Sequence, residues 1–263
     1  MNVLIGTSGY SYEDWRGVFY PIDLPKGKML DYYVNHFKCV EINSTYYTIP
    51  HFSVFQQLDK KTPVDFEFIV KLNKASTHER KNNKESIGKL IDAVQPIIEK
   101  DKFSGFLAQF PYSFKNTPDS RAYLSKIKEQ VGDFALFIEF RNWTWVRPET
   151  FEFLEQNNIC YVDVDEPALR GLIRPQGITT GKLGYIRFHG RNAKEWWAGS
   201  NQTRYNYLYS KSELDEWLIN LSRILKKTYK TYIFFNNHPQ GKAISNAKML
   251  QALFDAHLNR LQK

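Results

Sequence analysis

Apolar runs of strand-like composition alternate along this chain with segments of helical period, and nearly every such run ends in a charged or amide residue. In a β-strand, side chains two residues apart point to the same face. When strands are parallel, their carboxyl ends lie at one edge, where α/β enzymes place their sites. The sequence therefore predicts a parallel α/β fold whose polar side chains converge at one mouth.

The candidate site consists of the polar residues at or just beyond these strand ends. We predict three of them as catalytic residues, Glu41, Glu139 and His189. The remaining ones are predicted to bind substrate, and they are Asn43, Lys71, His78, Gln109, Arg141, Asp163, Arg187, Asn236, Asn237 and His238.

About eight strands are expected, at residues 3–7, 38–43, 66–71, 103–109, 136–141, 160–165, 184–189 and 232–238. A (β/α) barrel needs about 250 residues, and this chain has 263. We therefore predict a single domain, residues 1–263, folded as a TIM-like (β/α)8 barrel. Residues 167–181 are rich in glycine and proline, which predicts an irregular sixth crossover in place of a helix. An open doubly wound sheet is the alternative, because strand count does not prove closure.

Composition narrows the environment and the partners. The formal net charge is +8, with a sequence pI near 9.2, which favours anionic partners. Cys39 and Cys160 both lie in strand-like runs, which indicates buried thiols and not a disulfide framework. The N-terminus lacks the pattern of a signal peptide, and no apolar run reaches the roughly 18 residues of a membrane span. We expect a cytoplasmic protein without a membrane partner.

The charges of the candidate site favour an anion-binding or acid–base site. Carboxylates and imidazoles at a barrel mouth can ligate a divalent metal, but Lys71, Arg141 and Arg187 would repel it. Arginine instead engages phosphate or carboxylate bidentately. We predict no cofactor and assign no metal ligands, while a divalent metal stays open. Aromatic loop residues after several strands could stack sugars or nucleobases. The competing interpretation is an internal ion-pair network that performs no chemistry.

Several spaced motifs together resemble the YecE-like family, also called domain of unknown function 72. The matching stretches span the chain and are found at residues 6–10, 19–21, 40–47, 68–71, 77–78, 109–111, 138–141, 187–190, 235–238 and 246–247. One departure is Gln109-Phe110-Pro111, where the family often has two prolines after the glutamine. The resemblance implies a TIM-like barrel and supplies no reaction. Its barrel looks like those of metal-dependent phosphodiesterases and sugar isomerases, which is an analogy between folds.

Three functions follow from these observations. The leading hypothesis is an enzyme, a hydrolase or an isomerase, that binds an anionic small molecule or a nucleic-acid end. The second is a metal-dependent phosphodiester hydrolase with metals at His78, Glu139, Asp163, His189 and His238. The third is a non-catalytic protein that binds nucleic acid or a metabolite through its basic surface. The oligomeric state stays open.

Overall fold

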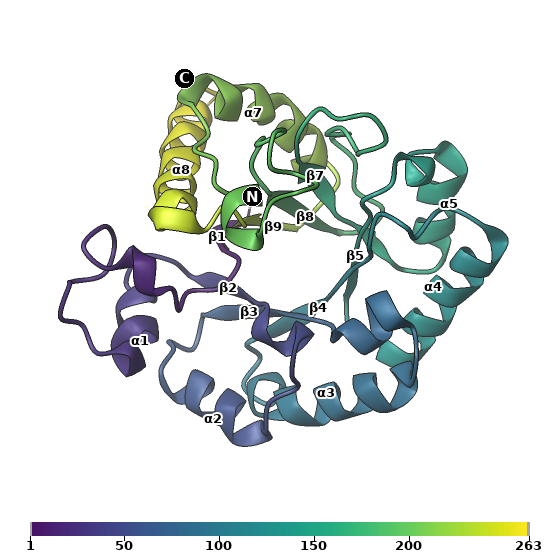
Figure 1. Cartoon of the computed structure of the whole chain (residues 1–263), viewed down its shortest axis with the longest axis horizontal. Coiled ribbons are helices and arrows are strands. Elements are labelled where there is room, and N and C mark those ends of the chain that lie inside the picture. The colour runs from purple at the N-terminus through teal and green to yellow at the C-terminus, as the bar shows by residue number, and fades with distance from the viewer. Residues whose placement is uncertain (1, 262–263) are drawn as a thin grey trace.

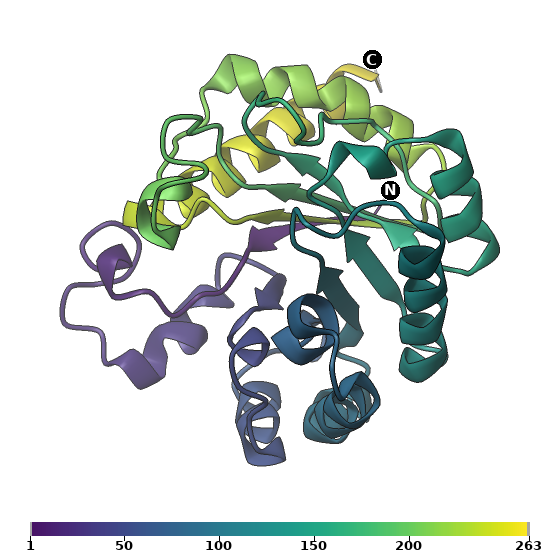
Figure 2. The ribbon, with the colours of Figure 1, turned by 45° about the vertical axis from the view of Figure 1, so that its right-hand side comes forward.

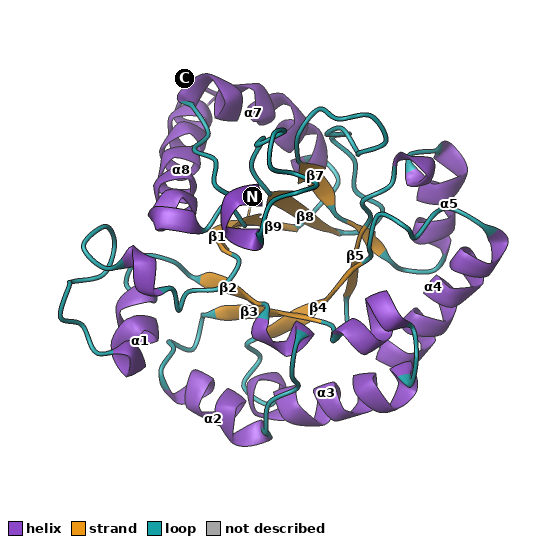
Figure 3. Ribbon diagram, in the orientation of Figure 1, coloured by secondary structure: helices purple, strands orange, loops and turns teal. Residues whose placement is uncertain are grey.

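The computed structural model describes residues 2–261, and the side chains of residues 2–257. The strands are β1 (Asn2–Thr7), β2 (Cys39–Ile42), β3 (Glu67–Lys71), β4 (Phe103–Gln109), β5 (Leu136–Glu139), β6 (Cys160–Tyr161), β7 (Asp163–Asp165), β8 (Leu183–Phe188) and β9 (Lys230–Phe235). The α-helices are α1 (Met29–Tyr33), α2 (Phe52–Lys60), α3 (Asn83–Ile98), α4 (Pro118–Val131), α5 (Pro148–Gln156), α6 (Asn201–Arg204), α7 (Lys211–Leu225) and α8 (Lys242–Leu261). The strands surround the centre of the molecule, and the longer helices lie outside the strands (Figures 1 and 3).

The strands form two sheets in which every pairing is parallel. One sheet has the order β2-β3-β4-β5-β6 and the other has the order β1-β9-β8-β7. An isolated parallel bridge between Ser8 and Glu41 links the ends of β1 and β2. The predicted parallel α/β fold is confirmed. The closed eight-stranded barrel and the single domain stay predictions, because the ladders of the described residues form two sheets. Figure 2 shows helices packed against the outer side of both.

The predicted strand at residues 160–165 is divided at Val162 into β6 and β7. At this division, Tyr161 and Asp163 form hydrogen bonds with the irregular segment at residues 176–180, and the strand ladder is interrupted. The Tyr161 N–H donates to Thr180 Oγ1 at 2.8 Å, and the Asp163 carboxylate accepts the N–H groups of Gln176 and Gly177 at 2.9 and 2.6 Å. No helix separates β7 from β8 within this described segment. The irregular sixth crossover is therefore present.

Local sequence explains where the covering helices begin. Pro148 occupies the first turn of α5, where its missing N–H costs no hydrogen bond. At α7, Ser210 Oγ accepts the N–H of Glu213, and the Glu213 carboxylate accepts the N–H of Ser210 at 2.8 Å. This reciprocal cap satisfies backbone donors that the helix leaves unpaired. Helix α7 then buries Trp217 and Leu221 against the sheet.

Both cysteines are free and buried, in agreement with their expected packing role. Among residues 2–261, no helix has the length and apolar character needed to cross a membrane.

Candidate functional site

The registers of the strands place five predicted residues on one face of the sheets. Cα pairing joins Glu41 with Ile69 and Lys71 with Leu107, and it joins Gln109 with Glu139. Because alternate residues share a face, this side carries Glu41, Lys71, Gln109 and Glu139. Arg187 on β8 reaches the same interior, where it contacts both glutamates.

Arg187 is the centre of a buried ion cluster. Its Nη2 lies 2.7 Å from Glu41 Oε1, and its Nη1 bonds to Glu139 Oε2. Tyr185 donates to the other oxygen of Glu41 at 2.5 Å, and Asn43 donates to Glu41 Oε1 at 2.8 Å. Burial alone would lower the pKa of Arg187, but the two carboxylates raise it. The guanidinium therefore stays charged and fixed between two strands.

Glu139 also holds a second arginine. Arg141 Nε lies 2.7 Å from Glu139 Oε1, and Arg141 Nη1 donates to Glu166 Oε2 at 3.1 Å. Burial would raise the pKa of Glu139, but Arg141 and Arg187 hold it well below its usual value. Burial raises the pKa of Glu166 to about 7, against the opposing charge of Arg141. Glu139 is thus an ionised anchor for two guanidinium groups.

His189 adjoins this cluster as a neutral ring. Burial and the nearby Arg141 lower its pKa to about 3. The Asn236 amide donates to His189 Nδ1 at 3.1 Å, which leaves the ring proton on Nε2. Nε2 lies 3.1 Å from Glu139 Oε1. At neutral pH the ring is a hydrogen-bonding group and not a cation.

Lys71 differs from the arginines because its closest partner is an amide. Its Nζ donates to Gln109 Oε1 at 3.0 Å and lies 4.7 Å from the centre of the Tyr46 ring. Burial, followed by repulsion from Arg187, lowers the pKa of Lys71 to about 7. A substantial fraction of this amine is therefore uncharged at neutral pH.

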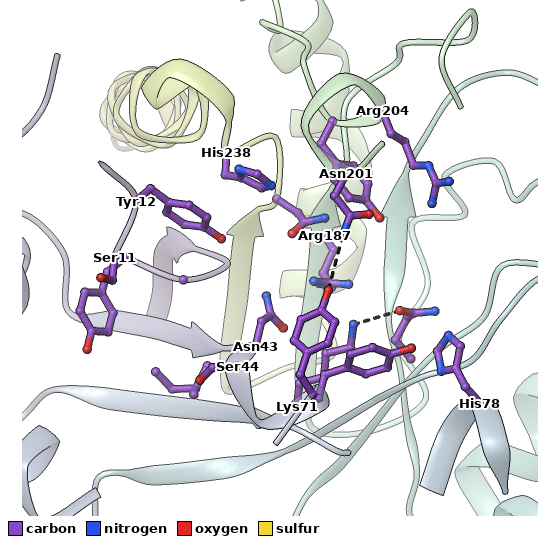
Figure 4. A pocket seen from close by; sticks show the side chains of 18 of the residues that line it. Ser11, Tyr12, Asn43, Ser44, Lys71, His78, Arg187, Asn201, Arg204 and His238 are labelled. Atoms are coloured by element: carbon purple, nitrogen blue, oxygen red, sulfur yellow. Dashed lines mark hydrogen bonds between the residues drawn. The ribbon is translucent and has the colours of Figure 1, made fainter. Parts of the chain in front are cut away.

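These side chains meet a cavity of about 740 Å³, shown in Figure 4. Eight predicted residues line it, and they are Asn43, Lys71, His78, Gln109, Arg141, Arg187, Asn236 and His238. Four cationic side chains line it, from Lys71, Arg141, Arg187 and Arg204. Among the residues that the structure describes, no Asp or Glu does so. The cavity surface is therefore cationic although the cluster beneath it contains carboxylates.

The three residues predicted as catalytic do not line this cavity. Glu41, Glu139 and His189 are fully buried, and each contacts a residue that does line it. Their arrangement beneath the cavity suits groups that hold Arg141, Arg187 and Asn236 in position. Their predicted role in proton transfer is not tested by this geometry.

Two predicted residues lie away from the cavity because of strand parity. In the β7–β8 register, Val164 pairs with Arg187, so Asp163 points to the opposite face. There it binds the backbone of the irregular crossover. Asn237 is likewise offset by one residue from Asn236, and its amide donates to Tyr207 O and Asn246 Oδ1.

Two histidines form part of the cavity wall as neutral rings. Burial and Lys71 lower the pKa of His78 to about 4, and its ring meets Tyr46 edge-on at 5.0 Å. His238 stacks on Tyr12 with ring centres 4.6 Å apart, and burial lowers its pKa. Both rings therefore supply shape and hydrogen bonding at neutral pH.

Sequence reasoning missed Glu166 and Arg204 as site residues. Glu166 has the parity of Val164, so it reaches Arg141 from the inner face. No signal in the sequence identifies Glu166, because the register of β7 against β8 is known only from the structure. Arg204 lies in α6, in a long loop without a regular pattern, and Figure 4 shows it beside the cavity. Its buried Nε has no partner within the described part of the chain.

Exposed aromatic rings lie at the edge of the cavity. Tyr47 and Trp197 are 63% and 54% exposed, and Trp197 meets Tyr112 edge-on at 5.0 Å. Such rings can stack a flat or apolar part of a ligand. The predicted aromatic loop residues are thus partly gathered around the cavity.

No metal-binding cluster forms within the described residues, since nowhere do three or more His, Cys, Asp or Glu side chains converge suitably. The five donors considered for a phosphodiester hydrolase are divided. Glu139 and His189 lie together beneath the cavity, His78 and His238 lie on its wall, and Asp163 faces the crossover.

Comparisons with known proteins identify the family. A family model described as "Protein of unknown function DUF72" matches residues 4–263. The UPF0759 protein YunF of Bacillus subtilis is 29% identical over 276 residues, which covers 98% of this chain and 97% of YunF. A solved DUF72 family structure from Thermotoga maritima is 40% identical, with a TM-score of 0.90, and covers 97% of this chain and 100% of that one. Another, from Enterococcus faecalis, is 27% identical with a TM-score of 0.85, over 96% and 95% of the two chains. Because the family model extends over nearly the whole sequence, this chain belongs to the DUF72 family, which is the YecE-like family that its motifs resemble.

Proposed function

We propose that this protein is an enzyme that binds a small molecule carrying a phosphate or another anionic group in the cavity. The observation that carries the proposal is the charge of the cavity wall. Four cationic side chains line it, while no carboxylate of the described chain does so. Guanidinium groups bind phosphate and carboxylate through charge-assisted hydrogen bonds, and partial burial strengthens them by excluding water.

Within this proposal, Arg141, Arg187 and Arg204 hold the anionic group, and the Lys71 amine contacts the ligand beside them. Asn43, Gln109 and Asn236 orient the ligand's hydroxyl groups. Asn43 Oδ1 supports this assignment, because it is buried beside the cavity without a hydrogen-bond partner in the described chain. A ligand hydroxyl would satisfy that acceptor.

We assign Glu41, Glu139 and His189 to positioning the cationic groups and the Asn236 amide. The ion pairs with Arg187 and Arg141 support this role, because prepositioned charges need no reorganisation when ligand binds. We further propose that the two sheets close into the predicted (β/α)8 barrel. Such closure would put all the strand ends around one mouth.

Isothermal titration calorimetry with glucose 6-phosphate and with glucose tests the anion site. We expect saturable binding of the phosphate ester and at least about tenfold weaker binding of the neutral sugar. Turnover of phosphorylated sugars is then followed by phosphate release for a hydrolase and by sugar exchange for an isomerase. Equal affinity for both sugars would contradict the proposal.

Salt dependence separates the small-ligand proposal from nucleic-acid binding. A single phosphate group releases few counterions, so its affinity should fall shallowly with salt concentration. A protein that neutralises several phosphates of a nucleic acid shows a steep slope. Tight oligonucleotide binding with a steep slope, combined with absent glucose 6-phosphate binding, would favour the non-catalytic interpretation.

A further inference from the structure

Lys71 is the one lysine that lines the cavity within the described chain. Two other partly or fully buried lysines have carboxylate partners. Lys102 Nζ lies 2.7 Å from Asp59, and Lys230 Nζ lies 2.7 Å from Glu67. No carboxylate oxygen of the described residues lies within 4.0 Å of Lys71 Nζ, whose hydrogen-bond partner is the Gln109 amide. Its amine therefore lacks the counter-ion that Lys102 and Lys230 have.

The surroundings of Lys71 favour an uncharged and nucleophilic amine. Its Nζ lies over the Tyr46 ring, and Arg187 lines the same cavity. A lysine in a desolvated site near another cation is activated for attack on carbonyl carbon. Its low pKa, about 7, agrees with this environment.

We propose that Lys71 forms an imine with an aldehyde or ketone that carries an anionic group, an inference that rests on the proposed anion site. The Nζ lone pair attacks the carbonyl carbon, and one N–H proton moves to the carbonyl oxygen to form a carbinolamine. The C–O bond then breaks, and the oxygen leaves as water with the second N–H proton. The products are a carbon–nitrogen double bond and one water molecule, with no change in oxidation state.

The cavity wall explains why the carbonyl compound should be anionic. Arg141, Arg187 and Arg204 line the same cavity as Lys71, and they can hold a phosphate or carboxylate while the carbonyl carbon meets the amine. Holding both reactants in one site raises their effective concentration. A neutral carbonyl compound has no such anchor.

Reductive trapping tests the imine. The protein is incubated with glycolaldehyde phosphate, reduced with sodium borohydride, digested and mapped by mass spectrometry. We expect the reduced adduct on Lys71 at about tenfold or more the level on the exposed Lys60, because the phosphate anchors the aldehyde. Lys102 should carry little adduct, since its amine is buried against Asp59.

Two matched conditions sharpen the test. Glycolaldehyde without phosphate should label Lys71 at least about tenfold less than the phosphorylated probe does, because it lacks the anchoring group. Inorganic phosphate should protect Lys71 from the phosphorylated probe. Lys71→Met, checked for folding by circular dichroism, should lose the selective adduct. The wild-type map is decisive even if this variant does not fold.

The outcomes separate the two proposals. Retained glucose 6-phosphate binding without preferential labelling of Lys71 would overturn the imine and leave the anion site intact. Absence of both binding and labelling would remove the anion site and the imine together. Labelling of Lys71 that does not depend on phosphate would also overturn the proposal, because it would reflect general amine reactivity.

Discussion

The two ends of the sheets use similar residues in opposite ways. At the amino ends, Glu67 of β3 pairs with Lys230 of β9 at 2.7 Å, and it also accepts from Ser104 and Tyr232. At the carboxyl ends, Arg187 and Arg141 bind Glu41 and Glu139, but their guanidinium groups also line a cavity. The cluster at the amino ends (the lower cluster) pairs its members with one another, whereas the cluster at the carboxyl ends (the upper cluster) also places cationic side chains on the cavity wall.

This difference shows which charged side chains can contact a molecule in the cavity. In parallel barrels the carboxyl ends of the strands typically carry function and the amino ends carry stability. Burial would raise the pKa of Glu67, but Lys230 and the two hydroxyl groups lower it. Glu67 is therefore bound by three donors at this end. In the upper cluster the carboxylates lie beneath the cations, so an anion in the cavity would not compete with the carboxylates for the same space.

The largest expected effect comes from removing the central cation of the upper cluster. Arg187→Met leaves Glu41 and Glu139 buried without that partner, so the free energy of unfolding should fall by roughly 3–5 kcal/mol. Urea denaturation followed by circular dichroism measures it. A loss no larger than that of Lys230→Met would remove the distinction between the two ends.

The next effect is a pH dependence that belongs to Lys71. Its pKa is about 7 in the fold, against an ordinary value of 10.5, so the unfolded chain binds more protons between these values. Stability should therefore rise with pH across this range in the wild type relative to Lys71→Met, by less than about 1.4 kcal/mol per pH unit. Urea titrations of both proteins from pH 6 to 9 measure the difference. Parallel curves would show that Lys71 titrates normally.

Arg204→Gln should weaken the binding of glucose 6-phosphate by about tenfold, or about 1.4 kcal/mol. Its stability should change by less than about 0.5 kcal/mol, because Arg204 takes no part in the buried ion pairs. Arg223→Gln, an exposed change on α7, is the matched control and should leave affinity unaltered. Calorimetry on both variants measures the affinities. Equal affinities would place the anion away from Arg204.

The smallest effect is expected at the lower end. Lys230→Met should reduce the free energy of unfolding by only about 1 kcal/mol, since Glu67 keeps two hydroxyl donors and its side chain is 17% exposed. Urea denaturation alongside Arg187→Met measures both under one condition. A loss of several kcal/mol would mean that the lower cluster is as dependent on its cation as the upper one.

Hydrophobic periodicity was sufficient to predict the parallel strands and the covering helices. Strand parity was sufficient to predict that Glu41 and Asn43 lie on one face, and likewise Glu139 and Arg141. The two members of each pair are in contact. It failed at Asp163, because the sequence does not show that β7 turns its aspartates away from Arg187.

The sequence also does not show how far each side chain lies below the surface of the cavity. The pattern places Glu139 and Arg141 on one face, but it does not reveal which lies beneath the cavity and which lines it. That depends on how far each side chain extends and on partners distant in the sequence. Arg204 was missed for a related reason, because loop residues carry no periodic signal of their position.

The contacts of β8 with Glu41 have a consequence for the order of folding. Arg187 and Tyr185 bind Glu41 across sequence separations of 146 and 144 residues, from one sheet to the other. Contacts of such long range close large loops and are slow to form. A chain with only one sheet folded would have an incomplete cluster and no ligand affinity. Ligand binding should therefore slow the exchange of amide hydrogens in both sheets together, so that the site reports on the completion of the whole fold.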